Sequence, residues 1–151
     1  MNSRNAIIAL FVAMTIAVGF GSAFLAPVTQ WYFDLNRPGF TPPPWLFAPV
    51  WTLLYLMIGA AGGLVWLKAP RSAAMWLWFA QLGLNGLWSI IFFRMRNLDL
   101  AVLVILALIL VILAFIRTSW QPERLAALLF VPYALWVGFA TLLNISFAAL
   151  N

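Results

Sequence analysis

Five long stretches of this chain contain no charged residue, and the charged side chains lie between them or near the chain start. The stretches are residues 6–26, 45–67, 72–93, 100–116 and 125–150. About 20 helical residues cross the hydrocarbon core of a bilayer, so each stretch is long enough, the fourth being the shortest. Lipid offers no hydrogen-bond partner to an open backbone, and the alternating pattern of a membrane barrel is absent. The sequence therefore predicts an all-α membrane protein, a bundle of five transmembrane helices.

Composition excludes a water-soluble domain and several kinds of site. Hydrophobic residues make up 66% of the 151 residues and charged residues only 7%, whereas soluble domains carry about 25% charged residues. The chain has neither cysteine nor histidine, so we expect no disulfide, no thiolate chemistry and no metal site. The basic residues form no cluster, which argues against binding to nucleic acid. With no long linker and no internal repeat, we expect a single domain over residues 1–151.

The first stretch sets the topology of the chain. It is longer than the roughly 7–15-residue core of a signal peptide, so we interpret it as a transmembrane helix rather than as a cleaved leader. The side of the membrane that holds the N-terminus carries the basic residues Arg4, Lys68, Arg71, Arg117 and Arg124. The opposite side carries Arg37, Arg94 and Arg96. The positive-inside rule then favours a cytoplasmic N-terminus.

The connection between the first two stretches, residues 27–44, is the longest and is rich in aromatic residues and proline. Its aromatic residues are Trp31, Tyr32, Phe33 and Phe40. A passive linker is rich in glycine and serine, whereas long ordered loops in compact domains often serve as lids. Two interpretations remain, a lid over the bundle or an aromatic anchor in the membrane interface, and we prefer the lid.

Several aromatic residues lie well inside the predicted helices rather than at their ends. Trp51 and Tyr55 are four residues apart and share one helix face. In the last stretch, Tyr133, Trp136 and Ala140 follow the same spacing of three and four. Aromatic walls of this kind suit a cavity for a flat apolar ligand. The alternative is that these rings only pack the core of the bundle.

A polar stripe runs along the third stretch. Gln81, Asn85 and Ser89 recur every four residues, and Trp78, Trp88 and Phe92 adjoin them. These groups either hydrogen-bond neighbouring helices, at about 0.6 kcal/mol each, or orient a ligand in the cavity. No stretch contains an ionisable Asp, Glu, Lys, Arg or His, which argues against proton-coupled transport and against general acid–base chemistry inside the membrane.

Small residues suggest close contact between helices. Gly59 and Gly63 have the spacing that permits two membrane helices to approach closely, and Ala17 and Gly21 form a similar pair in the first stretch. The sequence leaves open whether these contacts lie within one chain or between two.

Four motifs together resemble the TspO/MBR family, the tryptophan-rich sensory proteins related to the mitochondrial translocator protein. In chain order they are Trp31-Tyr-x-x-Leu35-x-Arg37-Pro38-x-x-x-Pro42-Pro43, Trp51-x-x-x-Tyr55, Asn85-x-x-Trp88-x-x-x-Phe92-Phe93 and Val131-Pro132-Tyr133-x-x-Trp136-x-x-x-Ala140-Thr141-x-x-Asn144. The resemblance covers nearly the whole chain and agrees with the count of five helices.

The resemblance implies a homodimer in a bacterial cell membrane that binds porphyrins, haem or benzodiazepine-site ligands beneath the first loop. It implies a role in tetrapyrrole transport or stress-linked regulation, with protoporphyrin or haem as a ligand rather than a required cofactor. The ligand-binding residues carried over are Trp31, Tyr32, Trp51, Tyr55, Asn85, Trp88, Phe92, Tyr133, Trp136 and Ala140. Because histidine is absent, haem would lack imidazole ligation, and a metal-free porphyrin is the expected ligand.

The resemblance also leaves alternatives to a binding protein. One is an enzyme that degrades porphyrin in light, with Trp51 and Trp136 as catalytic residues, although a non-enzymatic role is preferred. Another is a purely structural membrane protein. The chain also departs from the family: it has Arg37-Pro38 where Lys-Pro is usual, and its end lacks the Tyr and Arg of the animal cholesterol motif, so high-affinity cholesterol binding is not expected.

Overall fold

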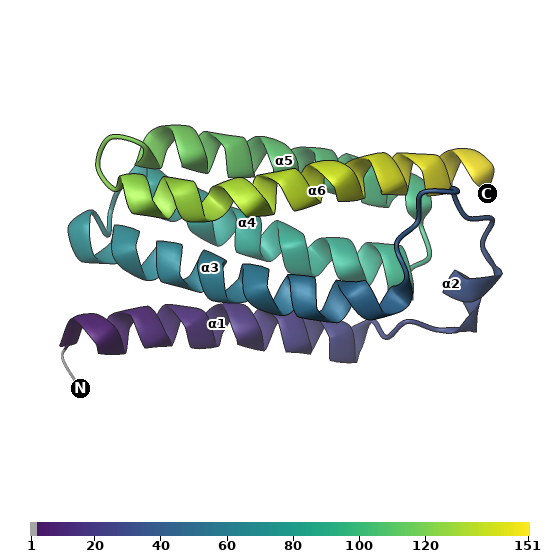
Figure 1. The fold of residues 1–151 in the computed structure, drawn as a ribbon, viewed down its shortest axis with the longest axis horizontal. Coiled ribbons are helices and arrows are strands. Elements are labelled where there is room, and N and C mark those ends of the chain that lie inside the picture. Colours follow the sequence, from purple (N-terminus) through teal and green to yellow (C-terminus); the bar gives the residue numbers. More distant parts are fainter. Residues whose placement is uncertain (1–2) are drawn as a thin grey trace.

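The computed structural model describes residues 3–151, and residues 1 and 2 of the predicted domain lie outside this part. The elements in chain order are α1 (Ser3–Leu25), α2 (Gln30–Asp34), the 3-10 helix η1 (Pro44–Leu46), α3 (Phe47–Lys68), α4 (Ala73–Ser89), the π-helix η2 (Ile90–Arg94), α5 (Leu98–Ser119) and α6 (Arg124–Leu150). Five helical segments are long and apolar enough to cross a membrane (Figure 1). The predicted all-α fold with five spanning helices is confirmed.

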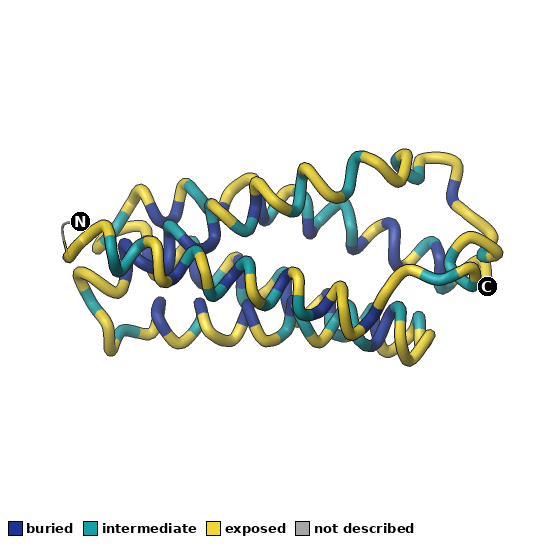
Figure 2. The backbone as a smooth tube through the Cα atoms, turned by 90° about the horizontal axis from the view of Figure 1, so that it is seen from below, coloured by how far each residue is buried: buried dark blue, intermediate teal, exposed yellow. Residues whose placement is uncertain are grey.

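The long helices lie side by side and close into a ring. In order around the ring, α1 packs on α3, α3 on α6, α6 on α5, α5 on α4, and α4 on α1. Buried positions face the interior and exposed positions line the outer sides (Figure 2). The outer sides carry large apolar residues such as Leu103, Leu110 and Leu135. A bundle with this exterior is suited to lipid rather than to water.

The fourth predicted stretch, residues 100–116, is shorter than the helix that contains it. Helix α5 begins after Asn97, whose side-chain Oδ1 accepts a hydrogen bond from the backbone N–H of Leu100 at 2.9 Å. Asp99 lies in its first turn and Arg117 in its last turn, where each charge is favoured by the helix dipole. The charge-free stretch therefore marks the apolar part of the helix and not its ends.

The glycine pair of α3 is a contact within the chain. A Cβ atom on Gly59 would clash with the backbone of Val12, and one on Gly63 would lie 2.8 Å from the Cα of Ile8. The pair thus permits α1 to approach α3 closely. A Cβ on Gly21, from the other small-residue pair, meets no atom within 4 Å, so that pair does not join helices in the monomer.

Substituting alanine for Gly59 is expected to destabilise the protein by about 1–3 kcal/mol, because the added methyl group overpacks a backbone contact. Gly83 in α4 is the matched control, since open space surrounds it. There, alanine is expected to stabilise the helix by about 0.4–1 kcal/mol. Thermal unfolding of the two purified variants in detergent, followed by tryptophan fluorescence, measures both effects. Equal shifts in the two variants would contradict the assigned packing.

Candidate functional site

A cavity of about 410 Å³ opens in the half of the bundle nearer to α2. Its walls come from α1, α2, α3, α4, η2 and α6, and its lining side chains are mostly apolar and aromatic. No charged side chain lines it. In residues 3–151, no group of three or more His, Cys, Asp and Glu side chains is placed to hold a metal ion. The volume falls in the range of ligand pockets, roughly 300–1,000 Å³.

Most of the site residues expected from the sequence meet at this cavity. Those that line it are Tyr32, Trp51, Tyr55, Asn85, Trp88, Phe92, Trp136 and Ala140. Trp31 and Tyr133 do not line it. Each of these two packs directly behind a residue that does, Trp31 behind Phe92 and Tyr133 behind Asn85.

Rings from α3 and α6 form the long walls. Trp51 and Tyr55 are stacked, with ring centroids 5.5 Å apart and planes 28° apart. Across the cavity, Trp136 packs edge-on against Phe47 at 5.8 Å. Its indole Nε1 is buried and has no hydrogen-bond partner among the described residues. A buried donor of this kind is costly unless it is paired.

A chain of hydrogen bonds connects the cavity to the core of the bundle. The Tyr55 hydroxyl donates to Asn85 Oδ1 at 3.1 Å, and Asn85 Nδ2 donates to the Tyr133 hydroxyl oxygen at 3.0 Å. The Tyr133 hydroxyl then donates to Gln81 Oε1 at 2.9 Å. Tyr133 and Gln81 are fully buried. Of the polar stripe on α4, Gln81 therefore acts as interhelical glue, whereas Asn85 reaches the cavity.

A second hydrogen bond fixes Trp88. Its Nε1 donates to Asn144 Oδ1 at 2.9 Å, and Asn144 Nδ2 donates to the carbonyl oxygen of Leu98 at 3.2 Å. Asn144 thereby ties α4, α6 and the start of α5 together beside the cavity. Because the amide is held at both ends, the Trp88 ring is fixed in the wall.

The π-helix η2 shapes the wall beside Trp88. Phe92 and Phe93 are consecutive, and neighbours in an α-helix point about 100° apart, yet both line the cavity. Their ring centroids are 4.8 Å apart, and Phe92 lies 5.0 Å from Trp88. π-turns of this kind are frequent at functional sites. Phe93 is not among the predicted lining residues, because α-helical spacing in the sequence does not predict the wider turn of a π-helix.

The loop over residues 27–44, here called the lid loop, packs onto the end of the bundle through α2. Tyr32 lines the cavity and contacts Phe93 at 5.6 Å and Phe147 at 5.7 Å between ring centroids. Burial raises the pKa of Tyr32, and the nearby Arg37 partly opposes this shift. The hydroxyl of Tyr32 is therefore neutral at physiological pH. These contacts place the loop against the cavity, and its action as a lid stays a prediction.

The side chain of Trp31, which belongs to α2, packs behind the cavity wall. Its ring packs edge-on against Phe92 at 6.1 Å, and the Arg96 guanidinium lies 5.7 Å from its centroid. The side chain is thus a support for Phe92 rather than part of the lining. The spacing of the motif places Trp31 and Tyr32 side by side in the sequence and does not distinguish these two positions.

A pair of asparagines ties the lid loop to the end of α6. The backbone N–H of Asn36 donates to Asn151 Oδ1 at 2.9 Å, and Asn151 Nδ2 donates to the Asn36 carbonyl oxygen at 3.1 Å. Asn36 Nδ2 also donates to the carbonyl oxygen of Leu150 at 3.2 Å. The two asparagines are 115 residues apart, and no local pattern in the sequence links them.

The sequence of this chain is similar to those of known proteins. The model of the TspO/MBR family matches residues 8–150. The tryptophan-rich protein TspO of Chlorobaculum tepidum is 40% identical over 162 residues, which cover 100% of this chain and 99% of that protein. The tryptophan-rich sensory protein of Cereibacter sphaeroides is 34% identical, with coverage of 100% and 95%. The human translocator protein is 37% identical over 121 residues, with coverage of 76% and 71%.

Proposed function

Since this chain belongs to the TspO/MBR family, we propose that it binds porphyrin-type tetrapyrroles in the cavity beneath α2. It is a multi-pass integral membrane protein. We place it in a bacterial cell membrane, where it acts in tetrapyrrole transport or stress-linked regulation. The proposal extends to benzodiazepine-site ligands in the same cavity and to a homodimer as the working form.

The observation that carries the proposal is a single uncharged cavity walled by aromatic rings. Rings from the lid, α3, η2 and α6 surround it, and the amides of Asn85 and Asn144 add hydrogen-bonding groups. The macrocycle of a porphyrin is flat and largely apolar, and its faces suit stacking and edge contacts with aromatic side chains. The chain contains no histidine or cysteine that would ligate iron in haem. A metal-free porphyrin is therefore the favoured ligand.

Titration of the purified protein with protoporphyrin, followed by quenching of tryptophan fluorescence, tests the proposal. Several tryptophans line the cavity, so saturable quenching is expected at equimolar ligand. An unrelated helical membrane protein in the same detergent is the control. Quenching no greater than in that control would refute the proposed function.

A light-dependent degradation of porphyrin is the second candidate function. It is favoured by one observation: Trp51 and Trp136 both line the cavity, so an excited porphyrin bound there would lie beside two indole rings. Dioxygen from air would be the oxidant. Illumination of the complex in air is then expected to give a discrete product. Substituting Phe for Trp51 or Trp136 should abolish that product and leave binding largely intact. If bleaching proceeds at the wild-type rate in both variants, the reaction is unspecific photo-oxidation.

The lid loop is expected to slow the release of ligand. Substituting Ala for Trp31 removes the support behind Phe92, and an aromatic contact contributes about 0.5–1.5 kcal/mol beyond burial. The off-rate of protoporphyrin should therefore rise about 2- to 10-fold, with little change in thermal stability. Stopped-flow fluorescence measures the release. Trp45→Ala is the control, because Trp45 is 72% exposed and lies outside the cavity lining. Equal off-rates in the two variants would mean that α2 is only an anchor in the membrane interface and does not slow release.

A further inference from the structure

The end of the bundle opposite α2 carries an excess of positive charge. This end holds the start of α1, the α3–α4 turn and the α5–α6 turn (Figure 1). Its basic residues are Arg4, Lys68, Arg71, Arg117 and Arg124. Its acidic residue is Glu123, which forms an ion pair with Lys68 at 2.6 Å. Within residues 3–151 this is the one ion pair, so the arginines of this end have no carboxylate partner.

An open groove lies at this end, where α5 meets the turn to α6. The residues that line it are Leu113, Ile116, Arg117, Thr118, Trp120 and Gln121. Leu113 and Ile116 lie deeper along α5, and the polar members lie at and beyond its last turn. The groove is therefore apolar toward the membrane centre and polar toward the membrane surface.

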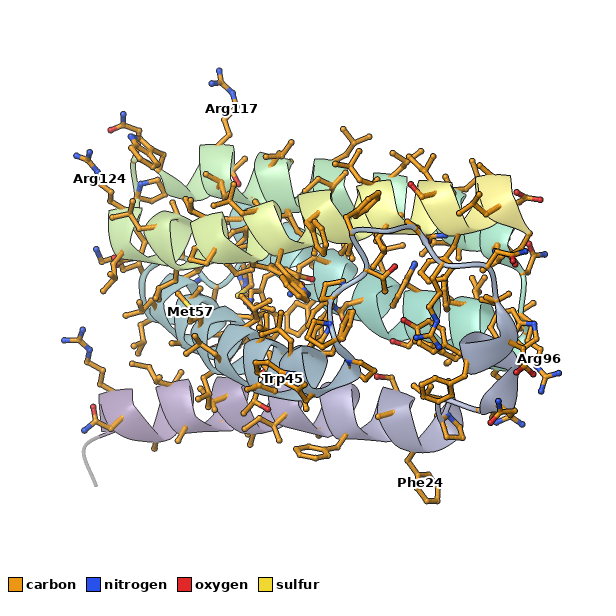
Figure 3. The ribbon with its side chains drawn as sticks, turned by 45° about the vertical axis from the view of Figure 1, so that its right-hand side comes forward. Phe24, Trp45, Met57, Arg96, Arg117 and Arg124 are labelled. Atoms are coloured by element: carbon orange, nitrogen blue, oxygen red, sulfur yellow. The ribbon has the colours of Figure 1, made fainter. Side chains whose placement is uncertain are left out.

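One arginine lines the polar part of the groove, and a second lies over the tryptophan of its wall. Arg117 lines it directly. The Arg124 guanidinium lies 4.8 Å from the centroid of the Trp120 ring, and Trp120 also lines the groove. Both arginines are exposed, and both side chains point away from the ribbon (Figure 3). Guanidinium groups bind phosphate oxygens with two parallel hydrogen bonds, and tryptophan favours the level of lipid headgroups.

We propose that this groove binds an anionic phospholipid. Its phosphate binds Arg117, Arg124 adds positive charge beside Trp120, and one acyl chain lies along Leu113 and Ile116. Charge complementarity selects the ligand, because neither arginine has an acidic partner and the whole end of the bundle is cationic. Basic pockets at helix ends are suited to anionic headgroups, whereas a zwitterionic lipid has no net charge to offset the arginines. The site is separate from the cavity beneath α2.

Binding of defined lipids to the purified full-length protein tests this proposal. The probes are phosphatidylglycerol, phosphatidylcholine with the same acyl chains, and inorganic phosphate, and the readouts are retained lipid in native mass spectrometry and the thermal unfolding temperature. Preferential retention of phosphatidylglycerol is expected. Because Arg117→Gln removes a charge-assisted contact with the phosphate, it should weaken this binding about tenfold or more, whereas Arg124→Gln and Arg117→Lys should weaken it less.

Arg71→Gln is the matched control, because Arg71 is exposed at the same end but neither lines the groove nor lies over its Trp120 ring. It should retain the wild-type affinity for phosphatidylglycerol. Equal weakening in all three glutamine variants would mean diffuse surface charge and would overturn the site. Equal binding of phosphatidylcholine would overturn the selectivity, and full stabilisation by inorganic phosphate alone would overturn the lipid as occupant. Unfolding of the lipid-free variants at the wild-type temperature establishes that they are folded.

Discussion

Substituting phenylalanine for Ala140 is expected to weaken protoporphyrin binding strongly while leaving the bundle folded. Ala140 lies on α6 one turn from Trp136 and lines the cavity. The added ring would occupy space that is open in the cavity of about 410 Å³, so the protein itself is not overpacked. A porphyrin would compete with that ring for the same space. Placing both the ring and the porphyrin in the cavity would overpack the complex. Overpacking costs typically about 1–3 kcal/mol, which corresponds to about a 5- to 150-fold loss of affinity.

Ala80→Phe is the matched control for this prediction. Ala80 is exposed on α4 and does not line the cavity, so the same change in size should leave affinity unaltered. Fluorescence titration gives the affinity of each variant, and thermal unfolding verifies the fold. Wild-type affinity in a folded Ala140→Phe protein would mean that porphyrin binds elsewhere.

The number and position of the helices could be predicted from the sequence because a bilayer fixes their length. Charges cannot remain in the hydrocarbon core, so uncharged stretches mark the spans directly. The same rule fails at helix ends: Asp99 and Arg117 lie inside α5, because charges are tolerated once the helix reaches the membrane surface. Part of the cavity lining could also be predicted, such as the pairs Trp51 and Tyr55, and Trp136 and Ala140, since residues at a spacing of three and four share a helix face.

The sequence did not predict that Tyr133 and Trp31 lie behind the cavity wall rather than in it. Tyr133 precedes Trp136 by three residues, yet it is fully buried behind Asn85, because a broad inward face includes both cavity and core positions. Trp31 packs behind Phe92. How deep such a side chain lies behind the cavity wall depends on the neighbouring helix, and the periodicity of a single helix does not describe that neighbour.

The sequence did not predict contacts between segments that lie far apart in the chain. The wall formed by α1 includes Gly19, where a Cβ atom would clash with the Tyr55 ring, and the helical pattern of α1 alone gives no sign of this partner. The link between Asn36 and Asn151 depends on where α6 ends relative to the lid loop. Both features arise from the packing of the ring of helices.

Substituting phenylalanine for Tyr133 is expected to destabilise the protein and to weaken porphyrin binding, although Tyr133 does not line the cavity. Loss of the hydroxyl leaves Gln81 Oε1 without its donor and Asn85 Nδ2 without its acceptor. Each buried polar group left unpaired costs about 1–3 kcal/mol. This exceeds the roughly 0.6 kcal/mol of an average hydrogen bond between membrane helices, because both stranded groups are buried. Thermal unfolding and fluorescence titration measure the two effects.

Tyr55→Phe separates a structural effect from a local one. The Tyr55 hydroxyl donates to Asn85 Oδ1, and both residues line the cavity, so the acceptor that it leaves is accessible to water or ligand. The loss of stability should then be close to the average of about 0.6 kcal/mol and clearly smaller than for Tyr133→Phe. Since Asn85 is held from the core side by Tyr133, its amide should lose its fixed orientation only when Tyr133 is changed. Equal losses of stability in the two variants would show that the buried half of the network does not position Asn85.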